Sequence, residues 1–144
     1  MKHGAPIDHF DERVAEDLEF DVIQAMLAEL AGCPSSEKRA ESLVPSKDRI
    51  WVLRRLQETD EMKRIRAGGH GFPLLEFDEL GREIKLLSVR DSVLSEESFR
   101  RISTASRIMN VVLDVLATSD ESWPRLEAVL EGQEPNTELI EAID

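Results

Sequence analysis

The segment between Pro45 and Gly68 constrains the fold most, because it contains neither glycine nor proline. Ser46 can cap a helix there, so the sequence predicts one long helix that ends at Ala67. Its apolar residues fall on two different sides. One side carries Ile50, Leu53 and Leu56, and the other carries Trp51, Met62 and Ile65. We therefore expect this helix to pack against different neighbours along its length.

Apolar residues recur at helical spacing in the rest of the chain as well, and no segment alternates as a strand would. The sequence therefore predicts an all-α fold, an irregular bundle of five to seven helices. Besides the long helix, the expected helical segments are 21–31, 34–42, 77–87, 95–117, 123–130 and 137–144.

Three of these segments carry specific expectations. Asp21 and Gln24 have the spacing of a capping box, before the inward positions Ile23, Met26, Leu27 and Leu30. Ser95 begins the best-patterned helix, with a stripe formed by Phe99, Ile102, Ala105, Met109, Val112 and Leu116. The last segment ends in Leu139, Ile140 and Ile143, which have nothing after them to pack against, so we expect the chain to continue in a longer protein.

The length and the charge of the chain limit the domain organisation and the functions that it can have. The chain has 144 residues, the size of one domain, and a net charge of −12. Residues 47–67 carry 7 basic and 4 acidic groups, which makes them the single basic region, whereas 114–144 carry 1 and 9. Residues 1–17 are polar and acidic, which predicts a flexible N-terminal arm before a helical domain over 18–144. A single cysteine, and no apolar run long enough for a signal or a membrane span, favour the cytoplasm.

The chain offers few residues with catalytic chemistry, and we assign no catalytic, cofactor-binding or metal-binding residue. Gly68, Gly69 and Gly71 follow a helix and lack the Lys-Ser or Lys-Thr of a phosphate-binding loop. His3, His9 and His70 are too scattered for a zinc site. Cys33 has no histidine or acid placed by sequence to activate it, so it is interpreted as a small apolar residue in a turn.

The basic residues of the long helix are the candidate nucleic-acid contact. They are Arg54, Arg55, Lys63, Arg64 and Arg66, supplemented by Arg100, Arg101 and Arg107. Glu58, Asp60 and Glu61 stand among them at i+3 and i+4 spacing, so solvated ion pairs are the favoured interpretation. Trp51 is interpreted as a packing anchor, with base stacking as the alternative.

Several short motifs, taken in order, resemble the MutS family of DNA mismatch-repair ATPases, in its type-two branch that lacks the mismatch-reading domain. Residues 18–21 read Leu-Glu-Phe-Asp, followed by Ile23. Residues 43–46 read Leu-Val-Pro-Ser, and 57–61 read Gln-Glu-Thr-Asp-Glu. Leu94 and Ser95 with Glu97 open the second long helix. Each motif is short, and their order carries the resemblance from Leu18 onward.

The resemblance implies that residues 18–144 are the N-terminal part of a helical core domain, truncated before the lever and clamp helices and the ATPase. This part would be a non-catalytic scaffold. The parent chain would be an ATPase that uses ATP and Mg, acts as a homodimer on DNA or a ribosome, and can carry a nuclease tail. The alternative from composition is a stand-alone acidic helical adaptor for protein–protein interaction.

Overall fold

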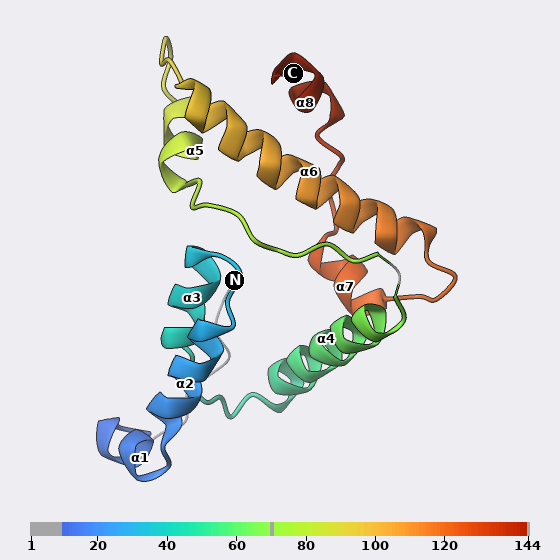
Figure 1. The fold of residues 1–144 in the computed structure, drawn as a ribbon. Helices are drawn as coiled ribbons and strands as arrows, with labels where there is room; N and C mark the ends of the chain where they lie inside the picture. The colour runs from blue at the N-terminus through green and yellow to red at the C-terminus, as the bar shows by residue number, and fades with distance from the viewer. Residues whose placement is uncertain (1–9, 70, 144) are drawn as a thin grey trace. The chain divides into compact units, whose positions relative to one another are not determined.

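The computed structural model describes residues 10–69 and 71–143. Within them the chain forms helices and no β-strand, which confirms the all-α prediction for the described residues (Figure 1). Seven of the helices coincide with the seven expected segments, and α1 is additional. The helices are α1 (Glu12–Asp17), α2 (Phe20–Glu29), α3 (Pro34–Glu41), α4 (Arg49–Ala67), α5 (Gly81–Leu87), α6 (Glu96–Thr118), α7 (Pro124–Val129) and α8 (Thr137–Ile143).

The chain divides into two units, Met1–Lys63 and Arg64–Asp144, with the boundary inside α4. Helix α1 of the first unit lies within the expected flexible arm. Asp11 caps it by accepting a hydrogen bond from the Val14 amide at 3.0 Å. The Phe10 ring meets the Phe20 ring edge to face at 5.4 Å. Residues 12–17 are therefore helical, residues 1–9 of the arm lie outside the described residues, and its flexibility stays a prediction.

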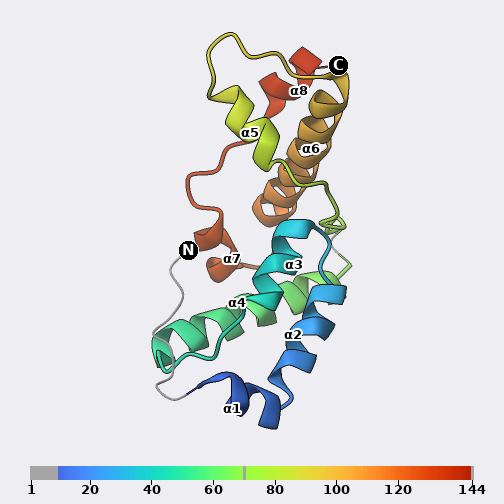
Figure 2. The ribbon, with the colours of Figure 1, turned by 90° about the vertical axis from the view of Figure 1, so that its left-hand side faces the viewer.

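Helices α2 and α3 form an antiparallel hairpin and lie side by side (Figures 1 and 2). The Gln24 side chain joins them, since its Nε2 donates to the carbonyl oxygens of Glu41 at 2.8 Å and Leu43 at 2.7 Å. These carbonyls lie at the C-terminal end of α3, where a helix leaves acceptors unsatisfied. The expected capping box is therefore wrong, because Asp21 lies inside α2 and Gln24 serves the neighbouring helix.

Helix α4 begins at Arg49, slightly later than expected. The Asp48 carboxylate accepts a hydrogen bond from the Trp51 amide at 3.0 Å, which makes Asp48 the capping residue. Ser46, the expected cap, instead accepts from the Asp48 amide at 3.1 Å. The expected long helix is otherwise present and ends at Ala67.

The buried apolar residues that the structure describes all belong to the second unit. They are Ile65, Ile102, Val112, Val115, Leu116, Trp123 and Leu126. Four of them come from α6, which Ser95 caps through the Ser98 amide at 3.2 Å, as predicted. The second half of α6 is thus the centre of this unit, because Val112, Val115 and Leu116 lie there.

Helices α5 and α8 flank α6 in the second unit (Figure 2). Helix α5 begins at Gly81 and not at Phe77, because a glycine inside a helix costs conformational entropy and here becomes the first helical residue. Helix α8 packs back on α6, and the Asn136 amide donates to Asn110 Oδ1 at 2.8 Å. Ile140 and Ile143, for which the sequence offers no later segment to pack against, are half-buried in the same helix that packs on the preceding α6.

Candidate functional site

The five basic residues proposed for nucleic-acid contact do not share a face of α4. Successive residues of an α-helix turn by about 100°, so Arg54 and Arg55 diverge by that angle and Lys63 points about 180° away from Arg54. Arg64 and Arg66 likewise differ by about 160°. The helix therefore distributes the positive charge around its circumference and forms no single basic stripe.

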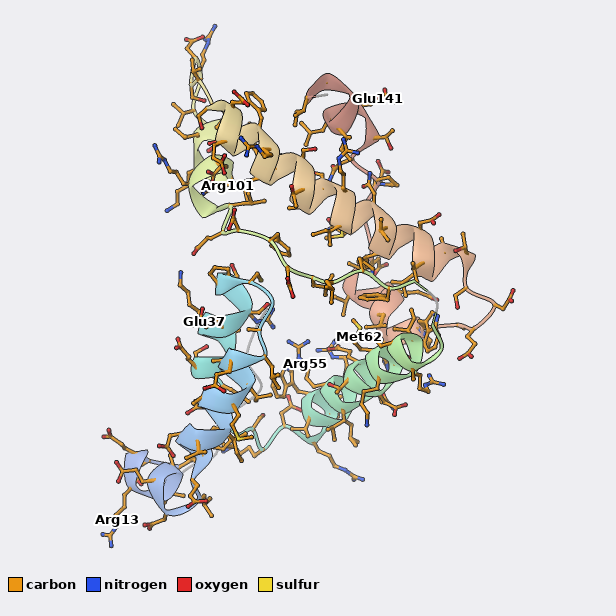
Figure 3. All side chains as sticks on the ribbon, viewed as in Figure 1. Arg13, Glu37, Arg55, Met62, Arg101 and Glu141 are labelled. Atoms are coloured by element: carbon orange, nitrogen blue, oxygen red, sulfur yellow. The ribbon has the colours of Figure 1, made fainter. Side chains whose placement is uncertain are left out.

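Arg55 is engaged within its own helix. Its Nη1 lies 2.6 Å from Glu58 Oε2, in the i, i+3 ion pair that the sequence favoured. Its guanidinium also lies over the Trp51 ring, 5.6 Å from the ring centroid. Figure 3 shows Arg55 on α4. Contact with a phosphate would compete with both interactions, so Arg55 is a weak candidate for nucleic-acid contact.

Arg64 is engaged too, in the second unit. Its guanidinium lies 5.0 Å from the centroid of the Trp123 ring, which is fully buried. The indole Nε1 donates to Ser119 Oγ at 2.9 Å, and the Trp123 amide donates to Glu127 Oε1 at 3.0 Å. A buried indole with its donor satisfied and a cation on its face is a packing anchor that ties the end of α4 to α7.

The anchor predicted from sequence was Trp51, which the structure leaves half-buried. Trp123 fills that role and was missed. The signal for it was present, because an aromatic residue directly before Pro124 opens a short helix and is placed to pack under its first turn. Base stacking by Trp51 stays a prediction.

The remaining basic candidates of α4 are Arg54, Lys63 and Arg66, all exposed. On α6, Arg100 pairs with Glu97 at 3.1 Å, and Arg101 pairs with Glu97 at 3.3 Å and with Asp78 at 3.4 Å. Figure 3 labels Arg101 on this helix. Arg107 Nε donates to Ser103 Oγ at 3.2 Å. Acidic and hydroxyl neighbours therefore occupy the supplementary arginines, and contact of any of these residues with nucleic acid stays a prediction.

One carboxylate is buried without full compensation. Glu83 of α5 is 4% exposed, and its Oε1 accepts a long hydrogen bond from Ser98 Oγ at 3.4 Å. Its Oε2 is buried and has no hydrogen-bond partner among the residues that the structure describes. The same helix exposes Ile84 and Leu87, so α5 buries its acid and turns apolar residues outward. The sequence did not predict this inversion, because Leu80, Ile84 and Leu87 recur at helical intervals, which indicates a helix but not which of its sides is buried.

The other sequence candidates have modest surroundings. Cys33 is half-buried before α3, with its Sγ 3.1 Å from Ser36 Oγ. Gly69 and Gly71 have positive φ, as an irregular connector needs, and their neighbour His70 lies outside the described residues together with His3 and His9. Over residues 10–69 and 71–143, no three or more His, Cys, Asp or Glu side chains converge as metal ligands. Nor does any helix there have the length and apolarity to span a membrane.

A shallow depression in the second unit lies between the end of α6 and α7, with a volume of about 500 Å³. Leu113, Leu116 and Leu130 form its apolar part. Its polar rim is acidic, with Asp120, Glu121 and Glu127. Such a rim repels phosphate groups, so this depression is a poor candidate for nucleotide or nucleic-acid contact.

Exposed apolar side chains are the most prominent surface feature of the first unit. The residues expected to point inward from α2 are in fact exposed, with Leu30 at 84% and Met26 at 59%. Ile50 of α4 is 82% exposed, and Leu53 and Leu56 beside it are exposed as well. The predicted burial of these residues is wrong within the described chain, because α3 contacts the opposite side of α2 through Gln24. Apolar surface gathered in this way is typical of an interaction site.

Comparison with known proteins gives one informative match. No family model matches the chain, and no solved structure matches it. An endonuclease MutS2 from Symbiobacterium thermophilum is 35% identical over 124 residues. The match covers 86% of this chain but only 14% of the length of that protein. The chain is therefore related in sequence to a segment of a MutS2 protein.

Proposed function

We propose that the chain is a non-catalytic helical scaffold of a MutS-like DNA repair or recombination ATPase. It would link the ATPase to the lever and clamp that hold DNA. The sequence similarity carries this proposal, because it extends over most of the chain and agrees with the ordered motifs from Leu18 to Glu97. The long helices α4 and α6 support it, since a packed helix can transmit a rigid displacement between two partners.

In the parent chain, ATP and Mg would be held outside these residues, and DNA or a ribosome would be the target of a homodimer in the cytoplasm. The S. thermophilum relative is named an endonuclease, and we propose a nuclease activity for the parent as well. Within this chain the Trp123 anchor would couple α4 to α7. A scaffold needs such an anchor, because two helices that are loosely packed do not transmit a displacement from one to the other.

A segment exchange tests the scaffold. The matching segment of the S. thermophilum protein is replaced by this chain, and ATP hydrolysis is measured with and without DNA. We expect the exchanged protein to keep a DNA-dependent rate, and the same protein with Trp123→Ala to hydrolyse ATP at a rate that no longer responds to DNA. A DNA response that survives Trp123→Ala would contradict the role of the anchor. Loss of hydrolysis in the exchanged protein, with its helical circular dichroism intact, would contradict the scaffold itself.

The alternative function, a stand-alone acidic adaptor, is favoured by the exposed apolar residues of the first unit together with the net charge of −12. The two functions differ in what the gene encodes after Asp144. A scaffold requires a downstream Gly-x-x-x-x-Gly-Lys-Ser/Thr phosphate-binding sequence in the same reading frame, and an adaptor requires none.

A further inference from the structure

Two apolar faces of the first unit point to a specific pairing. The first, called the α2 face, consists of Val22, Ile23, Met26, Leu27 and Leu30, all more than 40% exposed. The second, called the α4 face, consists of Ile50, Leu53 and Leu56. Each face follows one side of its helix at helical spacing, which is the form that helix–helix packing needs.

The charges beside the two faces are opposite. Glu29 follows Val22 by two turns on the same side of α2 and therefore flanks the α2 face. On α4, Arg49 precedes Leu53 by four residues and Arg54 follows Ile50 by four, so both flank the α4 face. These three charged side chains are exposed, and no ion pair of theirs is found among the described residues.

The surrounding segments have the same signs. Residues 10–32 carry 7 acidic groups and 1 basic group, a net −6, and residues 47–57 carry 4 basic groups and 1 acidic group, a net +3. Pairing two α2 faces would therefore bring two acidic segments together, and pairing two α4 faces would bring two basic ones together. Only the mixed pairing joins apolar surface and opposite charge at once.

We propose that the α2 face of one copy of this chain binds the α4 face of a second copy, and that the second copy returns the same contact. Such a reciprocal arrangement is the isologous interface of a twofold dimer, in which each copy contributes both halves. Glu29 of one copy then meets Arg49 and Arg54 of the other. Apolar burial supplies the affinity, and the charges fix which face meets which.

The size of the faces sets the expected strength. Each copy contributes eight apolar side chains, fewer than the 20–30 residues per side of a standard protein interface. The dimer should therefore be weak, with a Kd in the micromolar range. Because the flanking pairs are exposed, the Kd should rise with salt.

Two charge-reversed variants test the pairing by analytical ultracentrifugation of the 144-residue chain. The first carries Glu29→Lys, and the second carries Arg54→Glu. Each variant alone places like charges across both contacts, so we expect its Kd to rise by about tenfold or more. An equimolar mixture restores opposite charges at both contacts, so the mixture should dimerise about as well as the unaltered chain.

A matched control reverses one exposed charge in the second unit, with Arg82→Glu in one chain and Glu131→Lys in another. These changes should leave the Kd unchanged, and circular dichroism verifies that every variant stays helical. A chain that is monomeric at all concentrations overturns the proposal. A dimer whose Kd is unchanged by either charge reversal also overturns the proposal. The same holds if the equimolar mixture does not regain the Kd of the unaltered chain.

Discussion

Replacing Trp123 by alanine should remove the largest single contribution to the second unit. The indole is fully buried, so the change leaves a large cavity among Ile65, Leu126 and their neighbours. Truncation of a buried Trp costs about 3–5 kcal/mol, which already includes the lost packing. The hydrogen bond to Ser119 and the cation–π contact with Arg64 disappear as well, so we expect a loss of about 4–5 kcal/mol.

This loss is large relative to the total free energy of unfolding of a domain. A domain is stable by about 5–15 kcal/mol, and few other apolar side chains of this unit are buried. Urea denaturation followed by circular dichroism measures the free energy of unfolding without relying on tryptophan fluorescence, which the mutation itself changes. The m-value should stay constant if the change affects stability alone.

Trp51→Ala is the matched control, because it removes the same side chain from a half-buried position over which Arg55 lies. We expect it to cost about 1 kcal/mol, chiefly the partial burial and one exposed cation–π contact. Trp123→Phe should fall between the two, since it keeps an aromatic face for Arg64 and loses the donor to Ser119. Equal costs for Trp51→Ala and Trp123→Ala would refute the assignment of Trp123 as the anchor.

Three further outcomes follow from the geometry. Glu83→Met should raise the free energy of unfolding by about 1–2 kcal/mol, because it removes a buried carboxylate with one oxygen unpartnered among the described residues; a loss of more than 1 kcal/mol would show that the carboxylate is compensated. Gln24→Met should lower protection of the α2–α3 amides against hydrogen exchange by a factor corresponding to about 1–2 kcal/mol, and unchanged protection would contradict the role of its two hydrogen bonds. Duplex DNA should bind weakly, and the triple change of Arg54, Lys63 and Arg66 to Ala should flatten the salt dependence measured by fluorescence anisotropy; submicromolar binding at physiological salt that survives the triple change would refute this patch.

The sequence predicted the helices well because their boundaries depend on local chemistry. Ser95 caps α6, Pro124 opens α7 and the glycines after Ala67 end α4, as the residues themselves indicate. Where a predicted helix boundary was wrong, a nearby residue other than the predicted one sets it. Asp48 displaced Ser46 as the cap of α4, and Gly81 shortened α5.

Periodicity predicted less well which faces are covered. It shows where a helix is apolar but not whether a neighbour lies on that side. The stripe of α6 is largely buried because α8 and α5 flank the helix, whereas α2 turns its apolar residues outward because Gln24 binds the end of α3 on the other side. For α5 the helical spacing likewise did not indicate the buried side, since Glu83 is buried and Ile84 is exposed. Such outcomes depend on tertiary contacts that no local spacing encodes.

Arg54 connects the two surfaces that this chain offers to partners. It is the exposed cation next to the α4 face, and it is also one of the three basic candidates of α4 that remain exposed. A guanidinium that meets Glu29 of a second copy cannot at the same time neutralise a phosphate, so dimerisation and DNA binding through Arg54 oppose each other. Added salt weakens both dimerisation and DNA binding, so salt dependence does not distinguish one from the other. The change Glu29→Lys does separate them, because it removes the carboxylate that competes with phosphate while leaving Arg54 in place, and DNA affinity then rises only if Arg54 takes part in both contacts.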